Sequence, residues 1–208
     1  MKLAVIFAGA ILLTACTKNA PATLPSGNSS MLIPLNAGNL WNYADTNIDE
    51  DGTRSFTESE TMQIFQHVNI NNETWFFTNF FNSSGVFTRS VENEFYFRQS
   101  ATSDSFLFFA RTSGSSVVYR DTINASGDKE KYISYSNAYN MNGFDNLIKN
   151  VINQYAQSDT TKIRSYMEWY IKPGIGIVEI DSYSSKNVNG GEPFYLQRKA
   201  TLTSYLLN

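Results

Sequence analysis

The chain has 208 residues, with 16 lysines and arginines against 19 aspartates and glutamates, and a net charge of −3. This balance lacks the basic excess that captures nucleic acid, so we expect no nucleic-acid partner. The single histidine, His67, falls in a polar strand-like stretch, and no Gly-x-Ser-x-Gly elbow is present to form a triad with it. One histidine and one cysteine serve zinc poorly. We therefore predict a non-enzymatic protein with no catalytic residues, no metal site and no cofactor.

The first fifteen residues have the pattern of an export signal. Lys2 supplies a positive charge, and an uninterrupted apolar or small-residue run extends from Leu3 to Leu13. This run is too short for a membrane-spanning helix, which needs about 20 residues, and it fits the apolar region of a signal peptide, which needs about 7–15. Residues 1–15 are therefore predicted to be a signal peptide.

The residues that end this run indicate lipidation. Leu13-Thr14-Ala15-Cys16 resembles the bacterial lipobox, in which the cysteine thiol is diacylglycerylated and the chain is cut before it. The resemblance implies that Cys16 becomes a lipidated N-terminus carrying acyl chains such as palmitate, and two or more chains make membrane anchoring stable. The alternatives are an ordinary secretory signal with an incidental Cys16, or a cytosolic protein with an apolar N-terminus.

Residues 16–30 are expected to be the lipidated cysteine and a flexible tether, because Pro, Ser, Gly, Asn and Ala offer little to bury. The residues after Cys16 include no aspartate and no acidic cluster. By resemblance to known lipoprotein sorting rules, this favours the cell envelope at the periplasmic face of the outer membrane. The membrane, through the lipid anchor, is the expected partner.

Residues 31–208 have the texture of a single β domain. Aromatic residues make up 14% of the chain, and short runs of aromatic and β-branched residues are separated by Asn, Gly, Asp and Ser clusters. Short strands at regular spacing predict an antiparallel meander. We expect strands over residues 40–48, 53–70, 74–81, 86–91, 94–98, 105–110, 116–123, 129–136, 162–171, 175–183 and 194–207.

The segment 144–156 is ambiguous. Its apolar residues recur at the i, i+3, i+4, i+7, i+8 and i+11 spacing of an amphipathic helix: Phe144, Leu147, Ile148, Val151, Ile152 and Tyr155. Taken alone, this periodicity predicts a helix over residues 143–157.

Pro173-Gly174 follows a strictly alternating stretch and predicts a type II turn, since proline fixes φ near −65° and glycine accepts positive φ. Type II turns suit tight hairpins poorly. We therefore expect a wider connection or a sharp bend, with Gly174 and Gly176 leaving room on one face.

Three patches together resemble a group of uncharacterised bacterial lipoproteins from Bacteroidota-like organisms. Ile33 to Tyr43 is similar to that group's Pro-Leu-x-x-Gly-x-x-Trp-x-Tyr opening, Asn142 to Asn146 to its Gly-Phe turn, and Trp169 to Val178 to its Trp-Tyr-x-x-Gly-x-Gly-x-Val hairpin. The resemblance implies an all-β, antiparallel meander that forms a strongly curved sheet or half-open barrel. It also implies a strand after Phe144, which we favour over the helix. The extra Pro173 departs from the group's pattern.

Five aromatic residues are candidates for contact with a ligand, because large rings can form a platform or line a cavity for a sugar or a lipid. They are Trp41, Tyr43, Trp75, Trp169 and Tyr170. The competing interpretation, which we favour, is that such rings form the core, since they dominate the apolar area that a sheet must bury. Asp49 to Gly52 has the carboxylates of a calcium loop without its spacing, and we interpret it as a solvated hairpin turn.

Three functional hypotheses follow. The first is a binding or carrier lipoprotein whose curved sheet holds an apolar or amphipathic small ligand. The second is a structural or accessory envelope lipoprotein that binds another protein. The third, which we favour least, is a hydrolase of envelope polymers.

Overall fold

The computed structural model describes residues 31–56, 59–81, 85–112, 116–124, 127–157, 159–187 and 189–208. The predicted signal peptide, Cys16 and the tether lie outside these ranges. The described residues form thirteen strands: β1 (Leu40–Ile48), β2 (Arg54–Phe56), β3 (Glu60–Ile70), β4 (Glu73–Asn79), β5 (Val86–Val91), β6 (Glu94–Arg98), β7 (Phe106–Ala110), β8 (Val117–Ile123), β9 (Lys129–Met141), β10 (Phe144–Ala156), β11 (Asp159–Lys172), β12 (Gly176–Ser185) and β13 (Phe194–Leu206).

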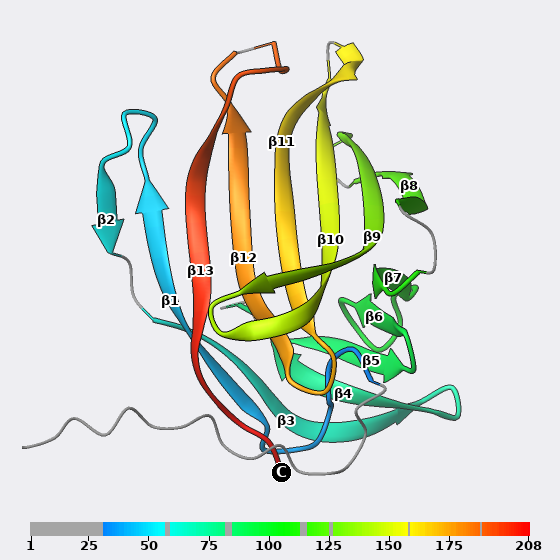
Figure 1. Ribbon diagram of the computed structural model, residues 1–208. Helices are drawn as coiled ribbons and strands as arrows, with labels where there is room; N and C mark the ends of the chain where they lie inside the picture. Colours follow the sequence, from blue (N-terminus) through cyan, green and yellow to red (C-terminus); the bar gives the residue numbers. More distant parts are fainter. Residues whose placement is uncertain are drawn as a thin grey trace, which may run out of the picture.

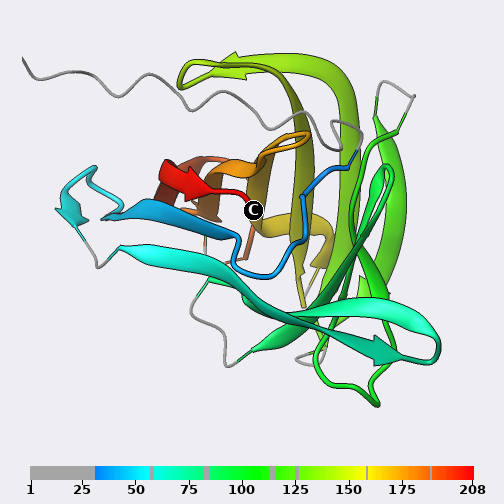
Figure 2. The same ribbon diagram turned by 90° about the horizontal axis from the view of Figure 1, so that it is seen from below.

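The strands form one antiparallel sheet that curls into a nearly closed barrel (Figures 1 and 2). Its order is β7-β6-β5-β4-β3-β1-β13-β12-β11-β10-β9-β8, with β2 attached to β1. The first and last long strands pair in the middle of this order, so the sheet is an up-and-down meander that is open between β7 and β8. The predicted all-β, strongly curved antiparallel meander is confirmed.

Side chains, and not a backbone ladder, bridge the opening between the two ends of the sheet. The Tyr119 hydroxyl donates to the carbonyl oxygen of Phe108 at 2.6 Å, and the Ser134 hydroxyl donates to that of Ala110 at 2.7 Å. The amide N–H of Ala110 donates to Asn150 Oδ1 at 3.2 Å. These bonds join β7 to β8, β9 and β10, and they satisfy part of the edge that β7 would otherwise expose.

The ambiguous segment is a strand, β10, as the family resemblance implies. Its helix-like periodicity has a physical cause: β10 buries apolar residues on both faces. Ile148 and Ile152 point into the barrel, whereas Leu147 lies in a second apolar cluster on the outer face with Tyr170 and Val178. The β9–β10 hairpin folds over β12 and β13 and covers that outer cluster (Figure 1).

The turn between β11 and β12 is of type II, as predicted. Ile175 N–H donates to the carbonyl oxygen of Lys172 at 3.0 Å, and Gly174 has φ +80°. Gly176 follows with φ +118°, and a Cβ there would lie 3.1 Å from Trp41 Nε1. The first and third patches of the resemblance therefore meet at this turn, where Trp41 Nε1–H donates to the Ile175 carbonyl oxygen at 2.6 Å.

Two strand predictions need adjustment. The stretch predicted as one strand over residues 53–70 is divided into β2, which pairs with β1, and the long β3. β9 extends to Met141, five residues beyond the predicted end at residue 136, because its last part forms the hairpin that folds over the sheet.

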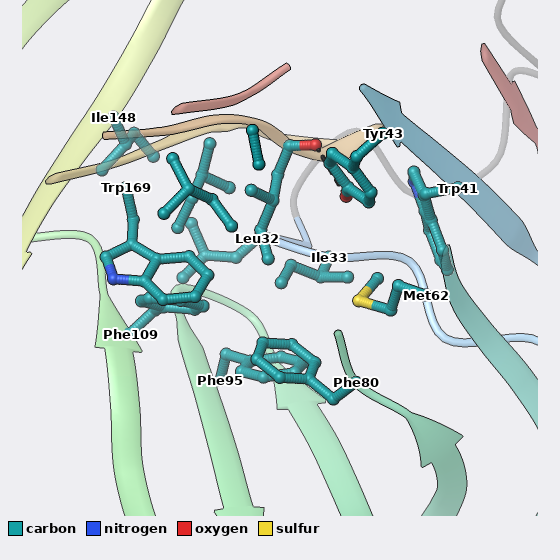
Figure 3. Close-up of a cluster of buried hydrophobic side chains, with 14 of the residues drawn as sticks. Leu32, Ile33, Trp41, Tyr43, Met62, Phe80, Phe95, Phe109, Ile148 and Trp169 are labelled. Atoms are coloured by element: carbon teal, nitrogen blue, oxygen red, sulfur yellow. Dashed lines mark hydrogen bonds between the residues drawn. The ribbon is translucent and has the colours of Figure 1, made fainter. Parts of the chain in front are cut away.

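The core occupies one end of the barrel, which we call the tether end because the chain enters the described structure there at Met31. The segment Met31–Leu35, which we call the strap, runs inside the ring of strands (Figure 2), and Leu32, Ile33 and Leu35 are buried. Figure 3 shows Leu32 and Ile33 between Trp169 on one side and Met62 on the other. None of the described residues form a helix long and apolar enough to cross a membrane.

Candidate functional site

The other end of the barrel, which we call the open end, holds a cavity of about 290 Å³. Its walls come from the halves of β1 and β10–β13 that lie away from the strap. Two stacked tyrosines, Tyr166 and Tyr183, line it together with apolar Ile152 and Met167. The other wall residues are polar: Asn47, Gln154, Ser165, Ser182, Gln197 and Arg198. Ile152 and Met167 pair across β10 and β11 and separate the cavity from the core beneath.

Arg198 supplies the positive charge of the cavity wall and is held by two carboxylates. Its Nε–H donates to both oxygens of Asp45, at 3.0 and 2.9 Å, and its Nη2 lies 2.5 Å from Glu60 Oε2. Burial raises the pKa of Glu60, and the attraction of Arg198 opposes that rise.

A second polar group lines the same end of the barrel. Gln154 Nε2 donates to Glu130 Oε1 at 3.1 Å, and Gln154 Oε1 accepts from the Ser165 hydroxyl at 2.8 Å. Tyr132 donates to Glu130 Oε2 at 2.9 Å. These bonds fix the orientation of Gln154, so the hydrogen-bonding groups at the open end are ordered.

The outer face of β11–β13 carries a network of charges under the β9–β10 hairpin. Lys199 Nζ lies 2.6 Å from Glu179 Oε1 and 3.4 Å from Asp181 Oδ1, and Asn142 of the hairpin donates to Glu179 Oε2. Burial, followed by the nearby Glu179 carboxylate, raises the pKa of Asp181 to about 6. The hairpin thus rests on a network whose charge changes near neutral pH.

The five aromatic candidates are all buried. The indole of Trp41 and the hydroxyl of Tyr43 bond to the carbonyl oxygens of Ile175 and Ile177 at the tether end. Trp169 packs against Phe80, Phe81, Phe108 and Phe109 inside the barrel (Figure 3).

The remaining two candidates lie elsewhere. The Arg98 guanidinium covers Trp75 at 5.0 Å, and Tyr170 lies in the outer cluster, where its hydroxyl donates to Glu168 at 2.6 Å. None of the five lines the cavity at the open end. Their positions match the core interpretation of the aromatic residues.

The other residues singled out from the sequence lie apart from the cavity. His67 is exposed on β3, and the segment Asp49–Gly52 turns β1 into β2 with an N–H of Gly52 bonded to the Asp49 carbonyl oxygen at 2.8 Å. In the described ranges, no group of three or more histidine, cysteine, aspartate or glutamate side chains is arranged to hold a metal ion.

The polar residues of the cavity wall and the carboxylates that hold Arg198 were not predicted from the sequence. Asp45 alternates with Trp41 and Tyr43 along one face of β1, so a carboxylate on an otherwise aromatic, inward-facing row was a usable signal. Arg198 stands in the middle of β13 and gave no comparable signal, because its partners are more than 130 residues away along the chain.

Comparison with solved structures shows the fold. The chain is similar to an exported protein with a YmcC-like fold, as its structure is described, from Bacteroides fragilis, with 12% identity, a TM-score of 0.50, and coverage of 86% of this chain and 100% of that one. A structure described as a lipoprotein from Parabacteroides distasonis aligns at 12% identity and a TM-score of 0.46, over 85% of this chain and 99% of that one. No protein-family model and no curated protein matches the chain.

Proposed function

We propose that this protein is a lipid-anchored, non-enzymatic lipoprotein of the cell envelope that binds a small amphipathic ligand at the open end of its barrel. The observation that carries the proposal is the division of the interior: the strap and core fill the tether end, whereas the open end keeps a cavity of about 290 Å³. This volume is at the lower limit of known small-molecule sites, about 300–1,000 Å³.

The chemistry of the wall favours an amphipathic ligand over a purely apolar one. Ile152 and Met167 offer an apolar floor, and Met167 is adaptable because its side chain is unbranched. Ordered amides, hydroxyls and the Arg198 network surround that floor. A ligand with a polar end toward solvent and a short apolar part toward the floor satisfies both.

The strap and the cavity lie at opposite ends of the described domain. The strap, which follows the predicted tether, enters at the tether end, and the cavity lies toward the far ends of β10 and β12. A protein anchored through Cys16 is therefore attached to the membrane through the end of the domain opposite its cavity. The ligand is expected to arrive from the aqueous side or from a partner.

Native mass spectrometry after gentle extraction tests ligand binding. The protein is produced with its export signal, and its mass is compared before and after denaturation. We expect a reproducible non-covalent adduct with the mass of a small lipid or glycan. A bare monomer from several growth conditions would contradict the proposal.

The anchor is tested by Cys16→Ala. We expect wild-type protein in the membrane fraction, carrying a diacylglycerol mass, and the variant outside it. Equal fractionation of both forms would show that Cys16 is not the anchor, and outer-membrane separation by density would test the predicted location.

A second candidate function is that of an accessory protein which binds another envelope protein. The observation in its favour is the edge strand β8, which among the described residues pairs only with β9 and exposes Val118 (51%) and Ile123 (71%). Crosslinking in whole cells from a residue placed in β8 would capture that protein, and a charged substitution of Ile123 would abolish the capture.

A further inference from the structure

Apolar residues on the outer face of the sheet follow one another across five neighbouring strands, in the order β13-β1-β3-β4-β5. Leu206 of β13 lies opposite Leu40 of β1. On β3, β4 and β5 the rings of Phe65, Phe77 and Phe87 follow, with centroids 5.9 and 5.4 Å apart. We call these five residues the apolar rim.

The rim faces outward because its neighbours along the strands face the core. Trp41 and Ile64, which adjoin Leu40 and Phe65, are fully buried inside the barrel. Phe65 and Leu206 are themselves 47% and 56% exposed. The β9–β10 hairpin covers the other apolar cluster of the outer face (Figure 1), whereas these two side chains reach solvent. Adjacent exposed apolar residues of this kind mark an interaction site.

Hydrogen bonds place the rim at the tether end. Ile64, which precedes the first phenylalanine of the rim, accepts from Gly38 N–H at 2.8 Å and donates to the Asn39 carbonyl oxygen at 2.9 Å. Asn39 Oδ1 in turn accepts the N–H of Asn208 at 2.8 Å, two residues after Leu206. The connection from the strap to β1 therefore lies beside both β3 and the last residues of β13, near the C-terminus in Figure 1.

The chain that precedes the strap limits how far this end can lie from a membrane. Fourteen residues, 17–30, separate Cys16 from Met31. A coil of this length spans about 20 Å on average. An anchor at Cys16 therefore keeps the tether end close to the bilayer, and contact between the two is intramolecular. Such a contact forms at a high effective concentration and needs little intrinsic affinity.

The polar groups beside the rim favour a lipid surface over a charged partner. Arg89, the next outward residue after Phe87 on β5, is paired with Glu73, with Arg89 Nη1 2.7 Å from Glu73 Oε1. This pair adds no net charge beside the rim. Gln63, which lies opposite Leu40, is neutral. Phenylalanine and leucine are also the residue types with which interfacial protein segments enter the boundary between lipid headgroups and acyl chains.

We propose that the apolar rim docks on the bilayer that holds the anchor, with its phenylalanine and leucine side chains in the interfacial layer. The occupant of the rim is the lipid surface itself. This inference rests on the lipid anchor of the proposed function and is independent of the cavity ligand. Docking fixes the orientation of the barrel, so that the tether end lies on the membrane and the open end faces away from it.

The test uses the full-length chain, purified with its anchor and reconstituted at low density in vesicles of palmitoyl-oleoyl phosphatidylcholine. Cys16 is the only cysteine, so its lipidation leaves no free thiol, and Gln66→Cys and Thr160→Cys each supply one labelling site. Gln66 is exposed beside Phe65, and Thr160 is exposed on β11 at the open end. Each site carries an environment-sensitive fluorophore, and lipids with a nitroxide on the acyl chain serve as quenchers.

We expect the Gln66 probe to shift its emission to shorter wavelength and to be quenched by the lipid nitroxide, while the Thr160 probe stays aqueous. The shift should persist at high salt, because apolar contacts are not screened. Phe65→Ser should lower the ratio of docked to undocked protein about tenfold, the effect of losing about half a buried phenylalanine side chain. The matched control is Ile123→Ser on β8, a position 71% exposed and outside the rim, which should leave the ratio unchanged.

Leu206→Ser tests the rim from a second strand and should also weaken docking, so the result does not depend on the folding of Phe65→Ser. A Gln66 probe that stays aqueous, or a shift that survives both serine variants, would overturn the inference. A shift seen only at high protein density would overturn it and assign the rim to contact between copies of this chain. A shift lost at high salt would overturn it in favour of charge.

The mass of the purified chain separates this inference from the proposed function. An anchored chain that carries the diacylglycerol mass and shows an aqueous Gln66 probe would refute docking alone and leave the anchor and the cavity proposal intact. A chain without that mass would remove the anchor and overturn both the anchoring proposal and this inference.

Discussion

Replacing Arg198 by methionine removes a cation that pairs with both Asp45 and Glu60 while keeping most of the side-chain volume. The side chains of Asp45 and Glu60 are only 6% and 14% exposed, so both carboxylates lose this ion pair in a largely desolvated place. Breaking a buried ion pair typically costs about 3–5 kcal/mol, and the one-third exposure of Arg198 screens part of this, so we expect a loss of about 2–4 kcal/mol near pH 7.5.

The loss depends on pH with a definite sign. Without Arg198 the pKa of Glu60 in the folded state rises further above its unfolded value, because the attraction that opposed the effect of burial is gone. The folded variant then takes up protons before the unfolded chain does, and its stability relative to the wild type recovers as the pH falls toward about 5.

Urea denaturation at the two pH values measures this loss, and Arg198→Met is compared with Lys186→Met. Lys186 is an exposed lysine whose Nζ lies 3.9 Å from Glu50, and its loss is expected to change stability by under about 0.5 kcal/mol. The reasoning about buried charge would be refuted if Arg198→Met lost less than about 1 kcal/mol of unfolding free energy at pH 7.5. It would also be refuted if the loss were the same at pH 7.5 and at about pH 5.

Three further predictions concern the strap, the β11–β12 turn and the outer face. Leu32→Ala should lower the unfolding free energy by about 2–5 kcal/mol in urea denaturation, because Leu32 is fully buried. Leu206→Ala, at an exposed position, should lower it by under about 0.5 kcal/mol. Equal losses would show that the strap is not part of the core. Gly176→Ala should lower the melting temperature more than Gly127→Ala, since both have positive φ but only the Cβ at Gly176 meets an indole ring, and the reverse order would contradict that contact. The folded-state pKa of Asp181 is about 6, which is above its unfolded value. As the pH falls from about 7.5 to 4.5, the wild type should therefore gain about 2 kcal/mol of stability relative to Asp181→Asn. If the stabilities of the two proteins changed identically with pH, the shift would be refuted.

Local sequence patterns were sufficient to predict most strands because alternation and turn chemistry act over a few residues. The boundaries of β1 match the prediction at both ends, and the type II turn at Pro173-Gly174 forms as its residue types require. β10 shows the limit of the same reasoning. Periodicity reports which residues are apolar, and a strand that buries both faces produces the spacing of a helix.

The candidate site was beyond prediction for a different reason. Alternation along β1 places Asp45 with Trp41 and Tyr43 on one face, but it does not say that one part of that face is packed and the other part lines a cavity. That division depends on where the strap lies, and the strap is held by contacts such as Gly174 N–H to the Met31 carbonyl oxygen, between residues far apart in the chain. The bond from Asn36 to the Asn208 carbonyl oxygen is of the same kind.

The proposed function requires that a ligand occupies the cavity at the open end. The direct measurement is native mass spectrometry of Ser182→Trp, which fills the cavity, beside Thr160→Trp, which places the same ring on an exposed position of β11. We predict that the adduct of the wild-type protein persists in Thr160→Trp and is lost in Ser182→Trp, with both variants folded. An adduct of unchanged mass and abundance in Ser182→Trp would contradict the claim and place the ligand elsewhere on the protein.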